Sequence, residues 1–298
     1  MLRSSGIILV LLLFSGLLSS CTYRFYQADC DFPTPGAMHK QFDLDSTVLE
    51  TSGLLCGEGG IWTFNDSGGE AALYCLDAGN GSLIRKSIVK NASNVDWESI
   101  TEDETHIFVA DVGNNFGNRD TLTIYRIPKT ALLSEDPEVI HDGIISLCFT
   151  GEIIKRETGY SNRDCEAILA YGDSLYLFSK DWIQQSTSVY ALPKEPGHYT
   201  LSALSTYQVR FLVTGADILP GKQQISLVGY RSYMPVVLSY EFENTPALIR
   251  CGGKARIYPL KVGRQVEGIC FDPAGNLLIS AEKSLKKQAL FRLGKPVL

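Results

Sequence analysis

Acidic residues recur at one place in a repeated pattern, and their spacing suggests metal chemistry. Five segments pair a polar residue with an aliphatic one shortly after it, and in four of them the polar residue is an acid. Carboxylates gathered without histidine or cysteine favour calcium or magnesium over zinc or iron. Calcium suits such a set best because it accepts six to eight oxygen ligands at flexible distances. The predicted calcium ligands are Glu98, Glu166, Asp217 and Glu267, whereas the first segment carries Ser52.

A second group of residues comes after the next hydrophobic run of each segment, and we predict it as the ligand-binding set. These residues are Asp66, Asp111, Trp182, Arg231 and Glu282. Carboxylates crowded at one face repel each other unless a cation binds or their pKa values rise. Three alternatives stay open. The acids can cap strands and form ion pairs, and the Gly- and Asn-rich stretches around Asp66 and Asp111 can be tight turns. Trp182 can equally serve in packing between repeats.

These segments belong to a unit that the chain repeats five times. Each unit holds three short runs rich in β-branched and aromatic residues, and a fourth run lies between units. Four strands repeated radially indicate a β-propeller, in which the inner strand starts and the second strand ends at one face. We therefore predict an all-β propeller of five blades of four antiparallel strands. Six blades are the main alternative, and a sandwich or two small β domains would show similar periodicity.

The two ends of the repeated region are expected to meet. The last unit lacks a fourth run, and residues 41–45 read as a strand that can supply it near Leu290. Such pairing would remove the exposed strand edges that an open ring leaves. The predicted propeller domain therefore covers residues 41–298.

The N-terminus predicts export and lipidation. Residues 1–20 combine one charge, Arg3, with a short apolar run, which is typical of a secretory signal. Leu18-Ser19-Ser20-Cys21 looks like a lipobox, so we expect cleavage before Cys21 and lipid on that cysteine. An ordinary signal peptide with a chance cysteine is the alternative. Residues 21–40 would then form a flexible spacer, and the protein would lie at the cell envelope, most naturally on the outer membrane.

Composition narrows the function further. The formal net charge is −6 and no Lys/Arg block is present, which argues against nucleic acid as a partner. No Gly-x-Ser-x-Gly segment occurs, so nucleophilic serine catalysis has little support. Eight cysteines are present, and lipid on one would leave seven, an odd number that requires a free thiol.

Several segments resemble a known group of proteins. They are residues 64–70, 94–98 and 111–115, with Tyr125-Arg126-Ile127. Together they are similar to uncharacterised secreted or lipid-anchored β-propeller proteins of Bacteroidetes, a resemblance that implies no established activity. The Glu-Gly/Ala-Ile segments more distantly resemble phytase-esterase-like and gluconolactonase-like propellers. The calcium-dependent members of those groups imply acids around the central channel, although Ser52 departs from that pattern.

Three functions are compatible with these observations. We expect a lipid-anchored envelope propeller that binds a small molecule, a glycan or a protein at its acidic face, through a divalent cation. The alternative is a metal-assisted hydrolase of phosphate esters, lactones or glycosides that uses the same residues. A third is an interaction module of an envelope complex, which would show an exposed apolar patch.

Overall fold

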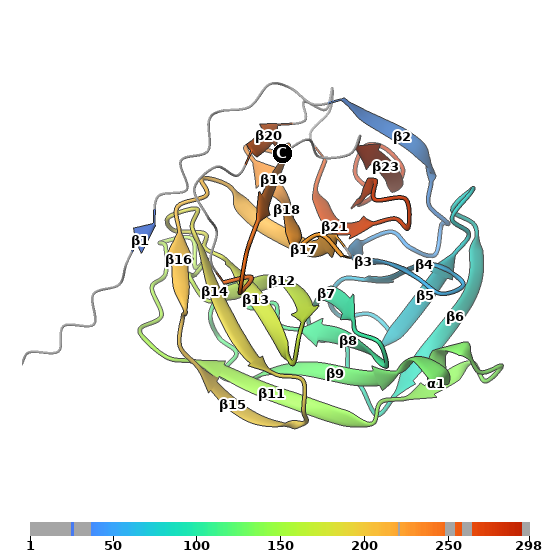
Figure 1. Cartoon of the computed structure of the whole chain (residues 1–298), viewed down its shortest axis with the longest axis horizontal. Helices are drawn as coiled ribbons and strands as arrows, with labels where there is room; N and C mark the ends of the chain where they lie inside the picture. Colours follow the sequence, from blue (N-terminus) through green and yellow to red (C-terminus); the bar gives the residue numbers. More distant parts are fainter. Residues whose placement is uncertain (1–24, 27–36, 220, 248–253, 258–263, 294–298) are drawn as a thin grey trace, which may run out of the picture.

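Five β-sheets stand around a central axis and form a closed β-propeller (Figure 1). The computed structural model describes residues 25–26, 37–219, 221–247, 254–257 and 264–293. Within this part of the chain one helix occurs, the five-residue α1 (Lys129–Leu133). No helix among the described residues is long and apolar enough to cross a membrane. The predicted all-β propeller of five blades is confirmed.

Each blade contains four antiparallel strands that run in chain order from the axis outward, except for the last strand of blade 5. Blades 1 and 2 consist of β3 (Thr51–Gly57), β4 (Gly60–Asn65), β5 (Ala72–Leu76) and β6 (Leu83–Lys90), then β7 (Trp97–Glu102), β8 (His106–Asp111), β9 (Leu122–Pro128) and β11 (Gly143–Phe149). Blades 3 and 4 consist of β12 (Asp164–Tyr171), β13 (Ser174–Lys180), β14 (Thr187–Pro193) and β16 (Ser205–Tyr207), then β17 (Leu212–Leu219), β18 (Gln224–Arg231), β19 (Met234–Glu241) and β20 (Lys254–Ile257). Blade 5 consists of β21 (Val266–Phe271), β22 (Leu277–Ala281), β23 (Ala289–Leu293) and β2 (Met38–Asp43).

Three further strands extend the outer edges of blades 1, 2 and 3, and all three pair in parallel. β10 (Glu138–Ile140) leaves the connection between β9 and β11 and pairs with β6 of the preceding blade. β15 (Gly197–Leu201) likewise leaves blade 3 and pairs with β11 of blade 2. β1 (Phe25–Tyr26) pairs with β16 of blade 3. These strands occupy edges that would otherwise expose unpaired backbone groups.

Apolar side chains fill the space between neighbouring blades. Residues on both faces of the inner strands are buried, so these strands do not alternate between buried and exposed positions. Between blades 1 and 2, the ring of Phe64 meets that of Trp97 edge-on at a centroid distance of 5.5 Å. Trp97 is fully buried and donates from Nε1 to the carbonyl oxygen of Ser93. Trp97 therefore serves in packing between blades.

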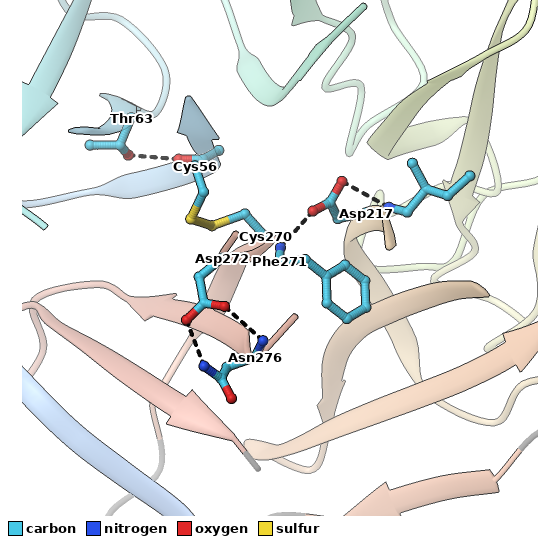
Figure 2. The surroundings of a disulfide bond; sticks show 9 residues. Cys56, Thr63, Asp217, Cys270, Phe271, Asp272 and Asn276 are labelled. Atoms are coloured by element: carbon cyan, nitrogen blue, oxygen red, sulfur yellow. Dashed lines mark hydrogen bonds between the residues drawn. A yellow bond between two sulfur atoms is a disulfide. The ribbon is translucent and has the colours of Figure 1, made fainter. Parts of the chain in front are cut away.

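The ring closes between the first and last blades in two ways. β2 pairs antiparallel with β23, with Phe42 opposite Leu290. At the inner strands, Cys56 of β3 and Cys270 of β21 form a disulfide across 214 residues of sequence (Figure 2). Thiols at Cys75, Cys148 and Cys165 are free among the described residues. β2 starts at Met38, so the closing strand takes three residues that the sequence analysis assigned to the spacer.

Some sequence expectations concern residues that the structure does not describe. The signal peptide, the lipidation site Cys21 and most of the spacer lie outside the described residues. Export and lipid anchoring therefore stay predictions.

Candidate functional site

A bulge in each inner strand aims a polar side chain toward the ring axis. In all five blades the strand register shifts near the start of the inner strand, where one or two of its residues have no partner on the second strand. Such a bulge leaves one residue unpaired and redirects its side chain. The residues at this position are Ser52, Glu98, Glu166, Thr214 and Glu267. Two of them connect blades, because Ser52 Oγ donates to the carbonyl oxygen of Glu98 and Thr214 Oγ1 to that of Val266.

Asp217 does not belong to this set of bulge residues, so its predicted position beside Glu98, Glu166 and Glu267 is wrong. In blade 4 the bulge lies between Val213 and Gly215, so Thr214 is the equivalent of the three glutamates. Asp217 lies three residues farther along β17, about 10 Å at the rise of a strand. Its carboxylate accepts a hydrogen bond from the backbone N–H group of Ile218 at 2.8 Å. It accepts another from that of Phe271 at 2.7 Å (Figure 2). Burial raises its pKa to about 7 despite these donors.

Asp217 instead lines a cavity of about 970 Å³ at the opposite end of the channel. The charged side chains that line this cavity are largely paired with one another. Lys194 binds Asp103 at 3.1 Å, and Arg126 binds Glu195 at 2.8 Å. The opposite mouth therefore contains no cluster of three potential metal ligands among the described residues.

The other three predicted calcium ligands, Glu98, Glu166 and Glu267, converge with four more acids at the mouth where the bulges lie. Three groups of carboxylates each bring one oxygen per residue within 4.8 Å of the others. The groups are Asp66, Asp96 and Glu98; Asp66, Glu267 and Glu282; and Glu98, Asp164 and Glu166. Adjacent groups share Asp66 or Glu98, so seven carboxylates form one continuous cluster. We call these seven residues the acidic mouth.

Burial and mutual repulsion raise the pKa values of acids in this mouth. Burial is the main cause for Glu98, whose pKa lies well above its usual value, and the charge of Glu166 adds to it. Burial together with Glu267 and Asp96 raises the pKa of Asp66 to about 7. Burial and the charge of Glu267 raise that of Glu282 to about 10. A divalent cation would relieve the same repulsion without a proton.

A single ammonium group faces the acids within the pocket lining. Lys180 is the last residue of β13, and its Nζ forms a buried ion pair with Glu166 Oε1. The same Nζ lies 4.6 Å from the ring centroid of Trp182 and 5.4 Å from that of Tyr230. Lys180 therefore offsets part of the negative charge of Glu166 while its methylene chain and head pack against aromatic rings.

Aromatic rings form one wall of the site. The rings of Phe116 and Tyr160 are stacked at 5.4 Å, and those of Tyr160 and Trp182 at 4.3 Å. Trp182 Nε1 donates to Asp164 Oδ2 at 2.8 Å, which ties this wall to the acids. Tyr230 lines the same pocket from blade 4. The pocket between these rings and the acids has a volume of about 260 Å³.

Three predicted ligand-binding residues lie outside the lining of this pocket, namely Asp111, Arg231 and Glu282, although Glu282 belongs to the acidic mouth. Asp111 is buried and accepts hydrogen bonds from the backbone N–H groups of Val95 and Asp96, and it binds Arg119 Nη2 at 2.7 Å. Arg119 also donates to the carbonyl oxygen of Gly113 at 2.7 Å. Asp111 therefore braces the loop that carries Asp96. Arg231 ends β18 and is not part of the lining.

Sequence reasoning missed Asp96 and Asp164 as site residues. Each stands two positions before a bulge glutamate, so the chain reads Asp-x-Glu in blades 2 and 3, and Gln265 holds that position in blade 5. Gln265 Nε2 donates to Glu267 Oε1 at 2.7 Å. The recurrence of this spacing was the signal that could have found them. Arg119, Phe116 and Tyr160 carry no comparable pattern because they lie in loops of unequal length.

Comparison with solved structures finds similar chains at low sequence identity. An exo-β-1,3-galactanase from Phanerochaete chrysosporium shares a TM-score of 0.52 at 12% identity, over 86% of this chain and 64% of the galactanase. A glucose dehydrogenase aligns with a TM-score of 0.46 at 10% identity, over 87% and 100% of the two chains. A Bacteroides uniformis protein assigned as a 6-phosphogluconolactonase aligns with a TM-score of 0.41 at 12% identity, over 83% and 72%. The sequence matches no protein-family model and no curated protein.

Proposed function

We propose that this chain binds a small polyhydroxylated ligand, such as one terminal sugar of a glycan, at the acidic mouth through a divalent cation. The observation that supports this most is the meeting of buried carboxylates and a stacked aromatic wall in one pocket. Calcium takes hydroxyl and water oxygens readily alongside carboxylates, so a diol could complete its coordination. Aromatic faces contribute affinity for the apolar face of a sugar ring.

The size of the pocket favours a small ligand. At about 260 Å³ it is slightly below the range of about 300–1,000 Å³ that is typical of small-molecule sites. A folded protein partner would contact the rim and could not enter. The ring of Phe116 is half exposed at the outer end of the aromatic stack, where a second sugar unit would lie.

A calcium titration tests the cation. After removal of metal with a chelator, calcium should raise the melting temperature by mass action, and chelator should reverse the shift. Glu267→Gln keeps the shape of the side chain and should remove most of this shift, whereas Glu104→Gln, an exposed acid at the opposite mouth, should not. An unchanged melting curve with no metal in the purified protein would rule out the cation.

A sugar-binding assay tests the ligand. Titration calorimetry with a panel of neutral and acidic monosaccharides should give heat only in the presence of calcium. Phe116→Ala should weaken sugar binding by at least tenfold and leave calcium binding within twofold, because its ring lines the pocket, stacks on Tyr160 and is not a metal ligand. Sugar binding that survives chelator, or no binding by any sugar, would contradict the proposal.

A second candidate is a hydrolase that uses the same mouth. Asp66 and Asp96 have pKa values raised by burial to about 7 and about 6, so they can hold or release a proton near neutral pH beside other carboxylates. That is the property of general acids and bases. Turnover of nitrophenyl glycosides, phosphate esters or lactones, lost in Asp66→Asn, would favour this candidate over binding alone.

We also propose that the chain is exported and held at the cell envelope by lipid on Cys21. The support is the lipobox-like Leu18-Ser19-Ser20-Cys21 after an apolar run. Cys21→Ala should abolish lipid labelling and release the protein from the membrane fraction. Membrane association that still requires detergent in this variant would contradict the idea.

A further inference from the structure

The acidic mouth contains two groups of potential metal ligands that have no residue in common. One group consists of Glu98, Asp164 and Glu166, and its members come from blades 2 and 3. The other consists of Asp66, Glu267 and Glu282, and its members come from blades 1 and 5. In each group the three carboxylate oxygens lie within 4.8 Å of one another, close enough to share one ion.

Each group also contains a buried oxygen that receives no hydrogen bond from an amine, amide or hydroxyl. In the first group it is Glu166 Oε2, since Lys180 occupies Oε1 of the same carboxylate. In the second it is Glu267 Oε2, since Gln265 occupies its Oε1. Glu166 is 2% exposed and Glu267 is 3% exposed, so bulk water does not reach either oxygen. Buried carboxylate oxygens without a partner are costly and rare in folded proteins.

We infer that the acidic mouth holds two divalent cations at separate positions, one in each group. This rests on the proposed function and refines it from a single cation to a two-cation centre. The third group, Asp66, Asp96 and Glu98, takes one member from each of the others and lies where a carboxylate could bridge both ions.

Charge supports two ions over one. When all are ionised, the seven carboxylates and Lys180 carry six net negative charges. One divalent cation leaves four and two leave two. Residual like charge in a buried site is strongly unfavourable. Oxygen-only ligands select calcium or magnesium for both positions.

A shared proton is the competing explanation for the second group. Glu267 and Glu282 are neighbours, and a proton on Glu282 could be donated to Glu267 in place of a metal contact. A proton on Glu98 would play the same part in the first group, since burial and the charge of Glu166 hold the pKa of Glu98 well above its usual value. The two explanations differ in the number of ions that the protein binds.

The test is a count of ions on the chain without its predicted signal peptide, residues 21–298 with Cys21→Ser, using calcium alone as the probe. Chelator-stripped protein is equilibrated with calcium, passed through a desalting column and analysed by elemental mass spectrometry, with titration calorimetry in parallel. Wild type should bind two ions per chain. Glu166→Gln and Glu282→Gln should each bind one, and the double variant none. The matched control Glu104→Gln should bind two.

The alternative outcomes separate the inference from the proposed function. One ion per chain in wild type, lost in Glu166→Gln and retained in Glu282→Gln, would mean that the second group shares a proton, and would overturn the inference while the cation-dependent function stands. No bound ion in wild type would overturn both. The wild-type count does not depend on the variants, so it decides the matter even if a substitution prevents folding. Circular dichroism verifies the fold of each variant.

Discussion

Thr214 occupies the bulge in blade 4 that glutamate occupies in blades 2, 3 and 5. The ring is therefore symmetric in backbone and asymmetric in charge. In blade 4, where the bulge carries no acid, Tyr230 lines the pocket and its ring lies near Lys180 Nζ. The acids surround the pocket from blades 1, 2, 3 and 5, and an aromatic ring approaches it from blade 4. A site of this form has a polar side for a cation and an apolar side for a ligand.

The pKa of Asp66 makes a prediction about stability and pH. Burial and neighbouring acids raise it to about 7 from 3.8. The folded state therefore holds this proton more tightly than the unfolded chain, and the stabilisation is present below pH 3.8 and lost as the pH rises through about 7. In chelator, Asp66→Asn should raise the free energy of unfolding at pH 8 by about 2 kcal/mol, half of the full linkage value because the side chain is partly exposed.

Urea unfolding at pH 4 and pH 8 measures this effect. At pH 4 the gain should shrink to a few tenths of a kcal/mol, since Asp66 is then protonated in the folded chain and only about half ionised in the unfolded chain. Asp173→Asn, which removes an exposed acid from a turn, is the control and should change little at either pH. An equal gain at both pH values would show that ionisation of Asp66 is not the cause.

At the scale of elements, repetition in the sequence predicted the blades but not the register within them. Alternating hydrophobic runs and turn residues identify strands because they reflect burial, which every blade repeats. Asp217 was misplaced because an Ala-Asp-Ile match resembles the glutamate segments in letters, while the bulge in β17 falls three residues earlier. Bulge position depends on packing against the next blade. It is therefore a tertiary property, and one sequence does not reveal it.

The loop between β8 and β9 gives a test of how elements set the site. Gly113 lies so close to the carboxylates of Asp96 and Glu98 that a Cβ atom there would overlap both. Gly113→Ala should displace these acids and reduce the calcium-induced rise in melting temperature by at least half, although no charge changes. Gly69→Ala in the loop after β4 is the matched control, because its nearest atom is 4.0 Å away. Equal shifts in both variants would contradict this role for Gly113.

At the scale of the whole molecule, closure depends on blades 1 and 5. The outer strands β2 and β23 supply hydrogen bonds, and the inner strands β3 and β21 supply the Cys56–Cys270 disulfide. The sequence predicted the strand pairing from the missing fourth run. It could not predict the disulfide, because seven candidate cysteines allow many pairings and only the fold brings these two together.

Removal of the disulfide should weaken the ring without opening it. A link across 214 residues restricts the unfolded chain, and chain-entropy arguments give at most about 5 kcal/mol for so long a loop. We expect Cys56→Ala with Cys270→Ala to cost about 2–4 kcal/mol in urea unfolding. Reductant should lower the free energy of unfolding of the wild-type protein by the same amount and leave that of the double variant unchanged. Cys148→Ala, which removes a free thiol, is the control; a similar loss there would contradict the assignment.

The pairing of β2 with β23 also determines when the ring can close during synthesis of the chain. β2 belongs to the earliest part of the propeller to be synthesised, and its partner β23 is the last described strand. Blades 1 to 4 can each form from contiguous chain as it emerges, but β2 has no place in the ring until β23 has been made. An edge strand that waits unpaired is open to pairing with other chains. The period of greatest risk for aggregation is therefore the interval before β23 emerges, when four blades are complete and the fifth still lacks its outer strands.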